Sequence, residues 1–307
     1  MSYTGLISKM ITFVALMLVG YVGARRKILD KAFARSLSQL LMNLFLTCTV
    51  LNSVISDRPD LSGGELGHVL LMLSIMVLLS YIMAAIAARI LPFKDENTPL
   101  FELLLGVSNI TFIGLPVLQS LYDTSAVLYC ALTCIPFNVV LYTYGVWRLK
   151  SGKKLGGGMR LKDALTIPLI ATFVALFIFA FDIKIPTVLA DFIGSTSAAT
   201  MPISMIVIGA TLGNVKLIDT FKEKRVYLLA LMRLVVFPAI VWLIMSNLTA
   251  NHVLLSTCVI LAGCPSAVVI TVFALQYDYD AEFASKGILA TTVMSMVTLP
   301  IWAMILG

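Results

Sequence analysis

The chain has 307 residues, of which 60% are hydrophobic and 12% are charged, and its mean hydropathy is +0.99. A soluble domain carries about a quarter charged residues, so this composition excludes a soluble protein and indicates a membrane protein. The net charge is +6, but the basic residues lie in short stretches between apolar runs. No basic patch is interleaved with aromatic residues, which argues against a nucleic-acid partner.

The cysteines all lie inside apolar runs, at Cys48, Cys130, Cys134, Cys258 and Cys264. We expect them to be small packing residues rather than a disulfide framework. Cys130 and Cys134 are one helical turn apart, but no histidine or acidic residue is near them to complete a metal-binding set. The sequence therefore predicts no metal and no cofactor.

Ten apolar segments follow one another along the chain, at 5–24, 33–56, 66–91, 99–122, 125–149, 162–181, 186–213, 224–246, 252–277 and 281–306. In lipid each segment must satisfy its own backbone polar groups, so we predict helices throughout. The first segment is followed directly by Arg25–Lys27 with no cleavage signal, which predicts a retained first helix. The fold class is therefore an all-α, multi-pass membrane protein with ten transmembrane helices.

The loop charges orient these helices. If the N-terminus is outside, the loops on the inside hold most of the basic residues, and the outside loops hold only Arg58 and Lys184. Because cytoplasmic loops carry an excess of Lys and Arg, both termini are predicted to lie outside the cell membrane (an inner or plasma membrane).

A basic, glycine-rich stretch at 151–161 predicts a cytoplasmic linker between a first half, 1–150, and a second half, 162–307. Each half holds five segments. With an odd number of crossings, the second half enters the membrane upside down relative to the first. This arrangement is that of the inverted-repeat transporters.

The fourth and ninth segments, which occupy matching positions in the halves, are both interrupted. The interruptions are Asn109–Pro116 and Gly263–Ala267, each with glycine, proline and polar residues. A broken helix presents the positive N-terminal end of its second half near the midplane, so two such ends facing each other would favour an anion. The alternative is a pair of ordinary proline kinks. We predict that the two segments cross and form a transport site.

Two further elements join the predicted site. In the fifth segment, Asn138 and Tyr142 are one turn apart on one face, and Asn138 serves either the substrate or an interhelical hydrogen bond. In the eighth, Arg233 either balances a carboxylate or extends to the inner membrane surface. The candidate substrate-binding residues are Asn109, Thr111, Gly114, Pro116, Asn138, Tyr142, Cys264, Pro265, Ser266 and Ala267.

The stretch Ser108–Pro116 (SNITFIGLP) resembles the fourth-helix motif of the auxin efflux carrier family, which includes bacterial PIN-like malonate and malate carriers. The resemblance covers nearly the whole chain. No single motif is specific to the family, but the order and spacing of the motifs together are. The further motifs are Met201–Pro202, Ile208–Leu212, Phe237–Pro238, Cys264–Ala267, Ala274–Tyr277 and Thr291–Pro300.

The resemblance implies a scaffold of the first, second, sixth and seventh helices that carries a homodimer interface. It implies a mobile transport domain of the other six helices, an elevator-type mechanism and carboxylate substrates. The chain departs from the family at Asn109–Phe112, where relatives usually carry Asn-Thr-Gly-Phe, so that Thr111 replaces a glycine. The larger Thr111 leaves the identity of the substrate open.

We therefore expect a secondary active or facilitative transporter of a small organic anion, with an anion channel or a transporter-like sensor as the alternative. An enzyme is not expected, because no nucleophile with a base, paired carboxylates or metal set is found at membrane depth. Glu102 lies near a segment end, so proton coupling has no obvious carrier group. A uniport driven by membrane potential, or coupling to a cation such as Na⁺ through backbone carbonyls, is favoured over coupling to H⁺.

Overall fold

The computed structural model describes residues 3–55, 63–90, 97–122, 124–153, 167–213 and 220–306. Within these ranges the chain is helical, apart from short connections and one isolated antiparallel bridge between Ser108 and Ser266. Most of the predicted linker (154–161), the start of the sixth segment (162–166) and Arg58 lie outside the described residues.

Five of the ten predicted segments form helices that are long and apolar enough to cross a membrane. One of them, the 28-residue α4, is about 42 Å long, more than the roughly 30 Å of a hydrocarbon core. The five are α4 (Gly63–Ile90), α7 (Thr124–Val140) continued by η3 (Leu141–Gly145) and α8 (Val146–Gly152), α10 (Thr187–Gly213), α12 (Lys224–Leu231) continued by η5 (Met232–Val236) and α13 (Phe237–Met245), and α16 (Ala281–Leu306).

The other five segments are also helical. They are α1 (Tyr3–Arg25), α2 (Lys31–Leu40) continued by η1 (Leu41–Phe45) and α3 (Leu46–Ile55), α5 (Thr98–Gly106) followed by η2 (Ile110–Gly114) and α6 (Leu115–Leu121), α9 (Ile167–Ala180), and α14 (His252–Ala262) followed by α15 (Val269–Gln276). The all-helical fold is thus confirmed. Ten crossings in two inverted repeats stay a prediction.

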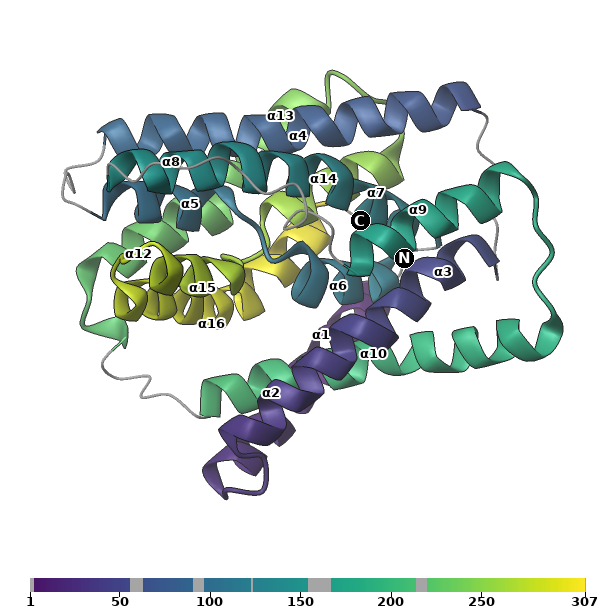
Figure 1. Ribbon diagram of the computed structural model, residues 1–307, viewed down its shortest axis with the longest axis horizontal. Coiled ribbons are helices and arrows are strands. Elements are labelled where there is room, and N and C mark those ends of the chain that lie inside the picture. Colours follow the sequence, from purple (N-terminus) through teal and green to yellow (C-terminus); the bar gives the residue numbers. More distant parts are fainter. Residues whose placement is uncertain are drawn as a thin grey trace.

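One group of helices is organised around the pair α1 and α10, which contact each other more extensively than any other two elements; α3 packs against α10, and α9 packs against α3. Figure 1 shows α10 along the lower edge of the molecule, with α1 running obliquely across it. Glycines allow this approach: a Cβ on Gly209 would lie 1.9 Å from the Met17 carbonyl oxygen, and one on Gly20 would lie 2.1 Å from the Ile206 carbonyl oxygen. The two backbones therefore touch directly.

A second group contains α4–α8 and α12–α16. Here α4 packs against α5 and α7, α12 packs against α16, and α13 packs against α14. Figure 1 shows α4 along the upper edge of the molecule, opposite to α10. The division into a scaffold (α1–α3, α9, α10) and a transport domain stays a prediction.

Candidate functional site

The fourth and ninth segments are both broken. After α5, the chain is extended at Val107, where φ is −98° and ψ is 108°, and helix resumes with η2 at Ile110. After α14, helix resumes with α15 at Val269. At about 1.5 Å per residue, the nine residues of α5 and the eleven of α14 reach about 14 and 17 Å, roughly half of a hydrocarbon core. Both breaks therefore suit the middle of a membrane.

The two breaks lie side by side and satisfy each other's backbone groups. The Asn109 N–H donates to the Pro265 carbonyl at 2.8 Å, and the Ala267 N–H donates to the Val107 carbonyl at 3.0 Å. Unpaired backbone groups are very costly in lipid, so this short antiparallel pairing is what makes two breaks at this depth tolerable. The predicted crossing of the two segments is therefore present.

The first break lies at the beginning of the predicted interruption Asn109–Pro116, and not at Pro116 itself. The chain leaves the helix at Val107–Asn109, and Pro116 follows the wide turn η2 as the second residue of α6. Proline is tolerated in the first turn of a helix, because the backbone donor it lacks has no partner there in any case. The break is instead stabilised by the Asn109 side chain, whose Oδ1 accepts a hydrogen bond from the Phe112 N–H at 3.2 Å.

A cavity of about 130 Å³ lies against the crossing. Five predicted residues line it: Asn109, Thr111, Asn138, Tyr142 and Ala267. The sequence interpretation missed the remaining lining residues, which are Ser108, Ile110, Phe112, Cys134, Phe137, Leu141, Val268 and Val269. Most of these directly adjoin predicted residues, so proximity in sequence was the available signal.

Two hydrogen-bond donors face this cavity without a partner. Among the described residues, neither the Nδ2 of Asn109 nor the hydroxyl of Thr111 makes a hydrogen bond. Tyr142 completes one wall, and its ring stands edge-on to Phe273 with the centroids 5.9 Å apart. The cavity thus combines neutral polar groups with an aromatic and aliphatic wall, a combination typical of small-molecule sites.

The other predicted site residues hold the crossing together and do not line the cavity. Ser266 is fully buried, and its hydroxyl donates to the Leu104 carbonyl at 2.7 Å. Its N–H donates to the Thr291 hydroxyl at 3.2 Å. A Cβ on Gly114 would lie 2.5 Å from the Leu261 Cδ2 and 3.3 Å from the Cys264 Sγ, so glycine lets η2 approach α14. Cys264 and Pro265 lie in the same paired backbone.

Arg233 is fully buried and joins both broken segments. Its Nη1 donates to the Leu105 carbonyl at 2.7 Å, its Nε donates to the Cys264 carbonyl at 3.0 Å, and its Nη2 bonds the Ser108 hydroxyl. The hypothesis that Arg233 extends to the membrane surface is therefore wrong, because the carbonyls exposed by the breaks hold it inside. No carboxylate is among its described partners.

The last turn of α5 shows why these partners gather here. Helix C-terminal carbonyls lack partners within the helix. In α5 the Leu103 carbonyl accepts from the Val107 N–H, the Leu104 carbonyl from Ser266, and the Leu105 carbonyl from Arg233. The negative end of this half-helix is thereby neutralised, whereas the beginnings of η2 and α15 lie at the cavity.

Three π-helical turns of the second group carry residues of this region. Thr111 and Phe112 lie in η2, Tyr142 in η3 and Arg233 in η5. Such turns are rare and often occur at functional sites. A proline follows two of them, and the Leu234 carbonyl, which Pro238 leaves without its helical donor, accepts a hydrogen bond from Trp302 Nε1 at 2.9 Å. The following proline is a sequence signal for η2 and η5, whereas no proline follows η3.

Glu102 is the second buried charge of the described residues, with 3% of the residue exposed. Its Oε2 accepts from Arg148 Nε at 2.7 Å, and its Oε1 bonds the Tyr144 hydroxyl. Glu102 lies near the start of α5, as expected from the sequence, but this end of the segment is buried and its carboxylate is ion-paired. The five cysteines are buried free thiols, and among the described residues no group of three or more His, Cys, Asp or Glu is placed to hold a metal.

Comparison with known proteins indicates the family to which this chain belongs. The sequence profile of the membrane transport protein family matches residues 6–156 and 154–303, which together span almost the whole chain. The chain belongs to this family, the auxin efflux carriers. It is also similar to a protein of Methanothermobacter thermautotrophicus described as an uncharacterized transporter, with 26% identity over 309 residues and full coverage of both chains. Membership in this family confirms the resemblance seen in the motifs and indicates a multi-pass membrane transporter.

Substitution of Asn138 tests whether this residue contacts the substrate in the cavity. Its Nδ2 donates to the Cys134 carbonyl of the same helix at 2.9 Å, so the described bond is not the interhelical one considered from the sequence. Replacing Asn138 by leucine should raise the KM for the transported substrate about three- to tenfold, because one neutral hydrogen bond to the substrate is lost. The melting temperature should hardly change. A lowered melting temperature with unchanged uptake would instead show a purely structural Asn138.

Proposed function

We propose that this family member is a secondary transporter, active or facilitative, that carries a small organic carboxylate anion by elevator-type alternating access. The observation that supports the proposal most is the cavity at the paired breaks, where Asn109 and Thr111 offer unused donors. No charged side chain is among the described lining residues, so no carboxylate there competes with an anionic ligand.

Electrostatics favours an anion over a cation at this position. The half-helices that begin at Ile110 and Val269 start at the cavity wall, and the N-terminal end of a helix carries roughly half a positive charge. Arg233 adds a full positive charge behind Ser108, which itself lines the cavity. In a site of low dielectric these contributions attract a carboxylate strongly.

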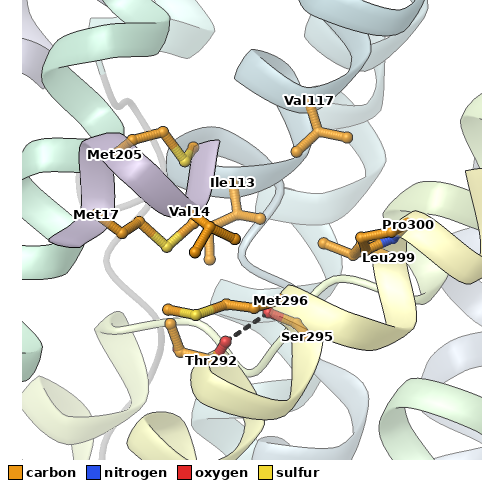
Figure 2. Close-up of a pocket in the computed structure, with 10 residues that line it drawn as sticks. All are labelled: Val14, Met17, Ile113, Val117, Met205, Thr292, Ser295, Met296, Leu299 and Pro300. Carbon is orange, nitrogen blue, oxygen red and sulfur yellow. Dashed lines mark hydrogen bonds between the residues drawn. The ribbon is translucent and has the colours of Figure 1, made fainter. Parts of the chain in front are cut away.

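The boundary between the two helix groups suits a sliding motion. A narrow gap of about 20 Å³ lies between Val14, Met17 and Met205 on one side and side chains of η2, α6 and α16 on the other. Figure 2 shows the side chains that line it. The hydrogen bond drawn there joins Ser295 to Thr292 within α16. Because methionine and other apolar side chains repack without directional bonds, such a boundary can be remade after a displacement.

A second, polar cavity of about 240 Å³ lies at another part of the same boundary. Thr49, Asn52 and Ser53 of α3 line it from the first group, and Gln119 of α6 and Thr124 of α7 line it from the second. Gln119 Nε2 donates to the Ser197 hydroxyl of α10 at 3.2 Å. A hydrated space between the groups would give a polar substrate a route toward the crossing.

The proposal extends to the assembly and its setting. We place the protein in the cell membrane with both termini outside, as a homodimer through helices of the first group. The exposed faces of α9 and α10 carry large apolar side chains, such as Phe173, Phe177 and Phe192, that suit lipid or a second copy. Membrane potential, or a coupling H⁺ or Na⁺, would drive net transport.

Reconstitution into proteoliposomes tests the proposal. Purified full-length protein should take up at least one radiolabelled carboxylate with saturation, and unlabelled substrate on the far side should accelerate the uptake by exchange. A channel would give flux without such acceleration, and a sensor would bind a ligand without flux. Absence of saturable uptake for every acid in a panel of mono- and dicarboxylates would contradict the proposal.

A further inference from the structure

The charge of Arg233 is not balanced by any charged group that the structure describes. Its three acceptors, the carbonyls of Leu105 and Cys264 and the hydroxyl of Ser108, are all neutral. The other buried charge, Glu102, already has a cationic partner in Arg148, at 2.7 Å. The core of the second group therefore carries one positive charge in excess.

This excess charge lies close to the cavity, because Arg233 bonds Ser108, which lines the cavity. Arg233 neutralises the C-terminal ends of the two half-helices that precede the breaks, each of which carries roughly half a negative charge. The corresponding positive ends of η2 and α15 remain at the cavity wall. Formally, one negative charge bound in the cavity would make this part of the protein neutral.

Resting on the proposed function, we propose that Arg233 sets the valence of the substrate, so that the site selects anions with a single negative charge. A dianion would place its second carboxylate against Phe112, Phe137 or Val268, with no second cation among the described lining residues. A buried charge without a partner is strongly disfavoured. Arg233 acts as a positioning and specificity residue, because its contact with the cavity runs through Ser108.

A second consequence concerns the membrane potential. Arg233 bonds both broken segments, so in the proposed mechanism it moves with the substrate site. The loaded unit then crosses with no net charge, and the empty unit returns with one positive charge. Moving one elementary charge through 100 mV biases an equilibrium by about 50-fold, so the two steps differ measurably.

Matched acids test the valence in the wild-type protein. In each of four pairs of acids, a terminal methyl group is replaced by a carboxylate at the same number of carbons: propionate and malonate, butyrate and succinate, valerate and glutarate, and p-toluate and terephthalate. At pH 7.5, well above the usual carboxyl pKa, we expect the best-binding acid in a thermal-shift titration to be a monocarboxylate, at least tenfold tighter than its dicarboxylate. Equal or tighter binding of the dicarboxylate would overturn the inference. If no acid shifts the melting temperature and none is taken up, the proposed function fails and the inference with it.

Substrate exchange measured at a fixed membrane potential distinguishes the proposed role of Arg233 from a purely structural one. With the best-binding acid saturating on both sides, exchange should change less than twofold between 0 and −100 mV set by a potassium gradient and valinomycin. Net uptake into empty vesicles should change severalfold. If saturable exchange follows the potential as strongly as net uptake does, the loaded unit is charged and the inference is wrong, although the transporter stands.

Substitutions then assign the effect to Arg233. Arg233→Lys should keep the preference for monocarboxylates at a lower melting temperature, and Arg233→Gln should lose it. Arg225→Gln is the matched control, because Arg225 lies in the same segment and its described ionic partner is Glu223 at 3.9 Å. A folded Arg233→Gln variant with unchanged preference would refute the assignment. If that variant does not fold, the exchange measurement on wild-type protein decides.

Discussion

Replacing Asn109 by alanine is expected to lower kcat/KM for the transported anion about 10- to 150-fold, the range given by one lost hydrogen bond to a charged group. The Asn109 side chain has two roles at the crossing. Its Oδ1 caps η2 through the Phe112 N–H, and its Nδ2 is an unused donor beside the cavity. Removing the cap alone costs about 1 kcal/mol, so the protein should still fold, with a melting temperature lowered by about 2–4 °C.

The matched control is Asn247→Ala. Asn247 is exposed after α13, and its Nδ2 donates to the Leu243 carbonyl of its own helix at 2.7 Å. Uptake by this variant should equal that of the wild type. Uptake of labelled anion into proteoliposomes, normalised to reconstituted protein, checks both variants. Unchanged kinetics for Asn109→Ala would place the substrate elsewhere.

Replacing Gly209 by alanine should destabilise the protein by about 3 kcal/mol or more, because the added methyl group meets backbone and not a movable side chain. The new Cβ would lie 1.9 Å from the Met17 carbonyl oxygen, so α1 and α10 would have to separate. This pair is the most extensive contact of the first group. A drop of about 6–12 °C in melting temperature, or loss of monodisperse protein, is the expected result.

Gly67→Ala serves as the control for this substitution. Gly67 lies in α4, and apart from its chain neighbours and the backbone of its own helix, no atom lies within 4 Å of a Cβ added to it, so the methyl group meets open space. Alanine is also the better helix former, by up to about 1 kcal/mol, and the melting temperature should hold or rise slightly. If Gly209→Ala melts like Gly67→Ala, α1 and α10 do not make the close backbone contact described above.

The helices could be predicted from the sequence, because a backbone in lipid must satisfy its own polar groups and a helix does so within one segment. Ten apolar runs gave ten helical regions, and glycine and proline near Asn109 and Pro265 marked both breaks. The exact site of the first break could not be read from Pro116, since a proline at the start of α6 fits a continuing helix as well as a broken one.

The partners of the polar residues were harder to predict, because they depend on contacts between segments far apart in sequence. Ser266 was predicted to bind substrate, yet its hydroxyl satisfies the Leu104 carbonyl. Arg233 lies 128 residues from Leu105, whose carbonyl it bonds, and no local pattern indicates that pairing. The π-helical turns likewise arise from tertiary packing, so Thr111 and Tyr142 were predicted from polarity and position alone.

Labelling of Thr111→Cys from each side of the membrane tests the central claim most directly. A Cys134→Ala variant provides the background, because Cys134 lines the same cavity, whereas the other four cysteines are buried and do not line it. In sealed proteoliposomes of known orientation, a membrane-impermeant thiol reagent should label Thr111→Cys from either side, and the saturating carboxylate should protect it. Labelling from one side only, or labelling unaffected by any transported acid, would contradict a site at the crossing that opens alternately to the two sides.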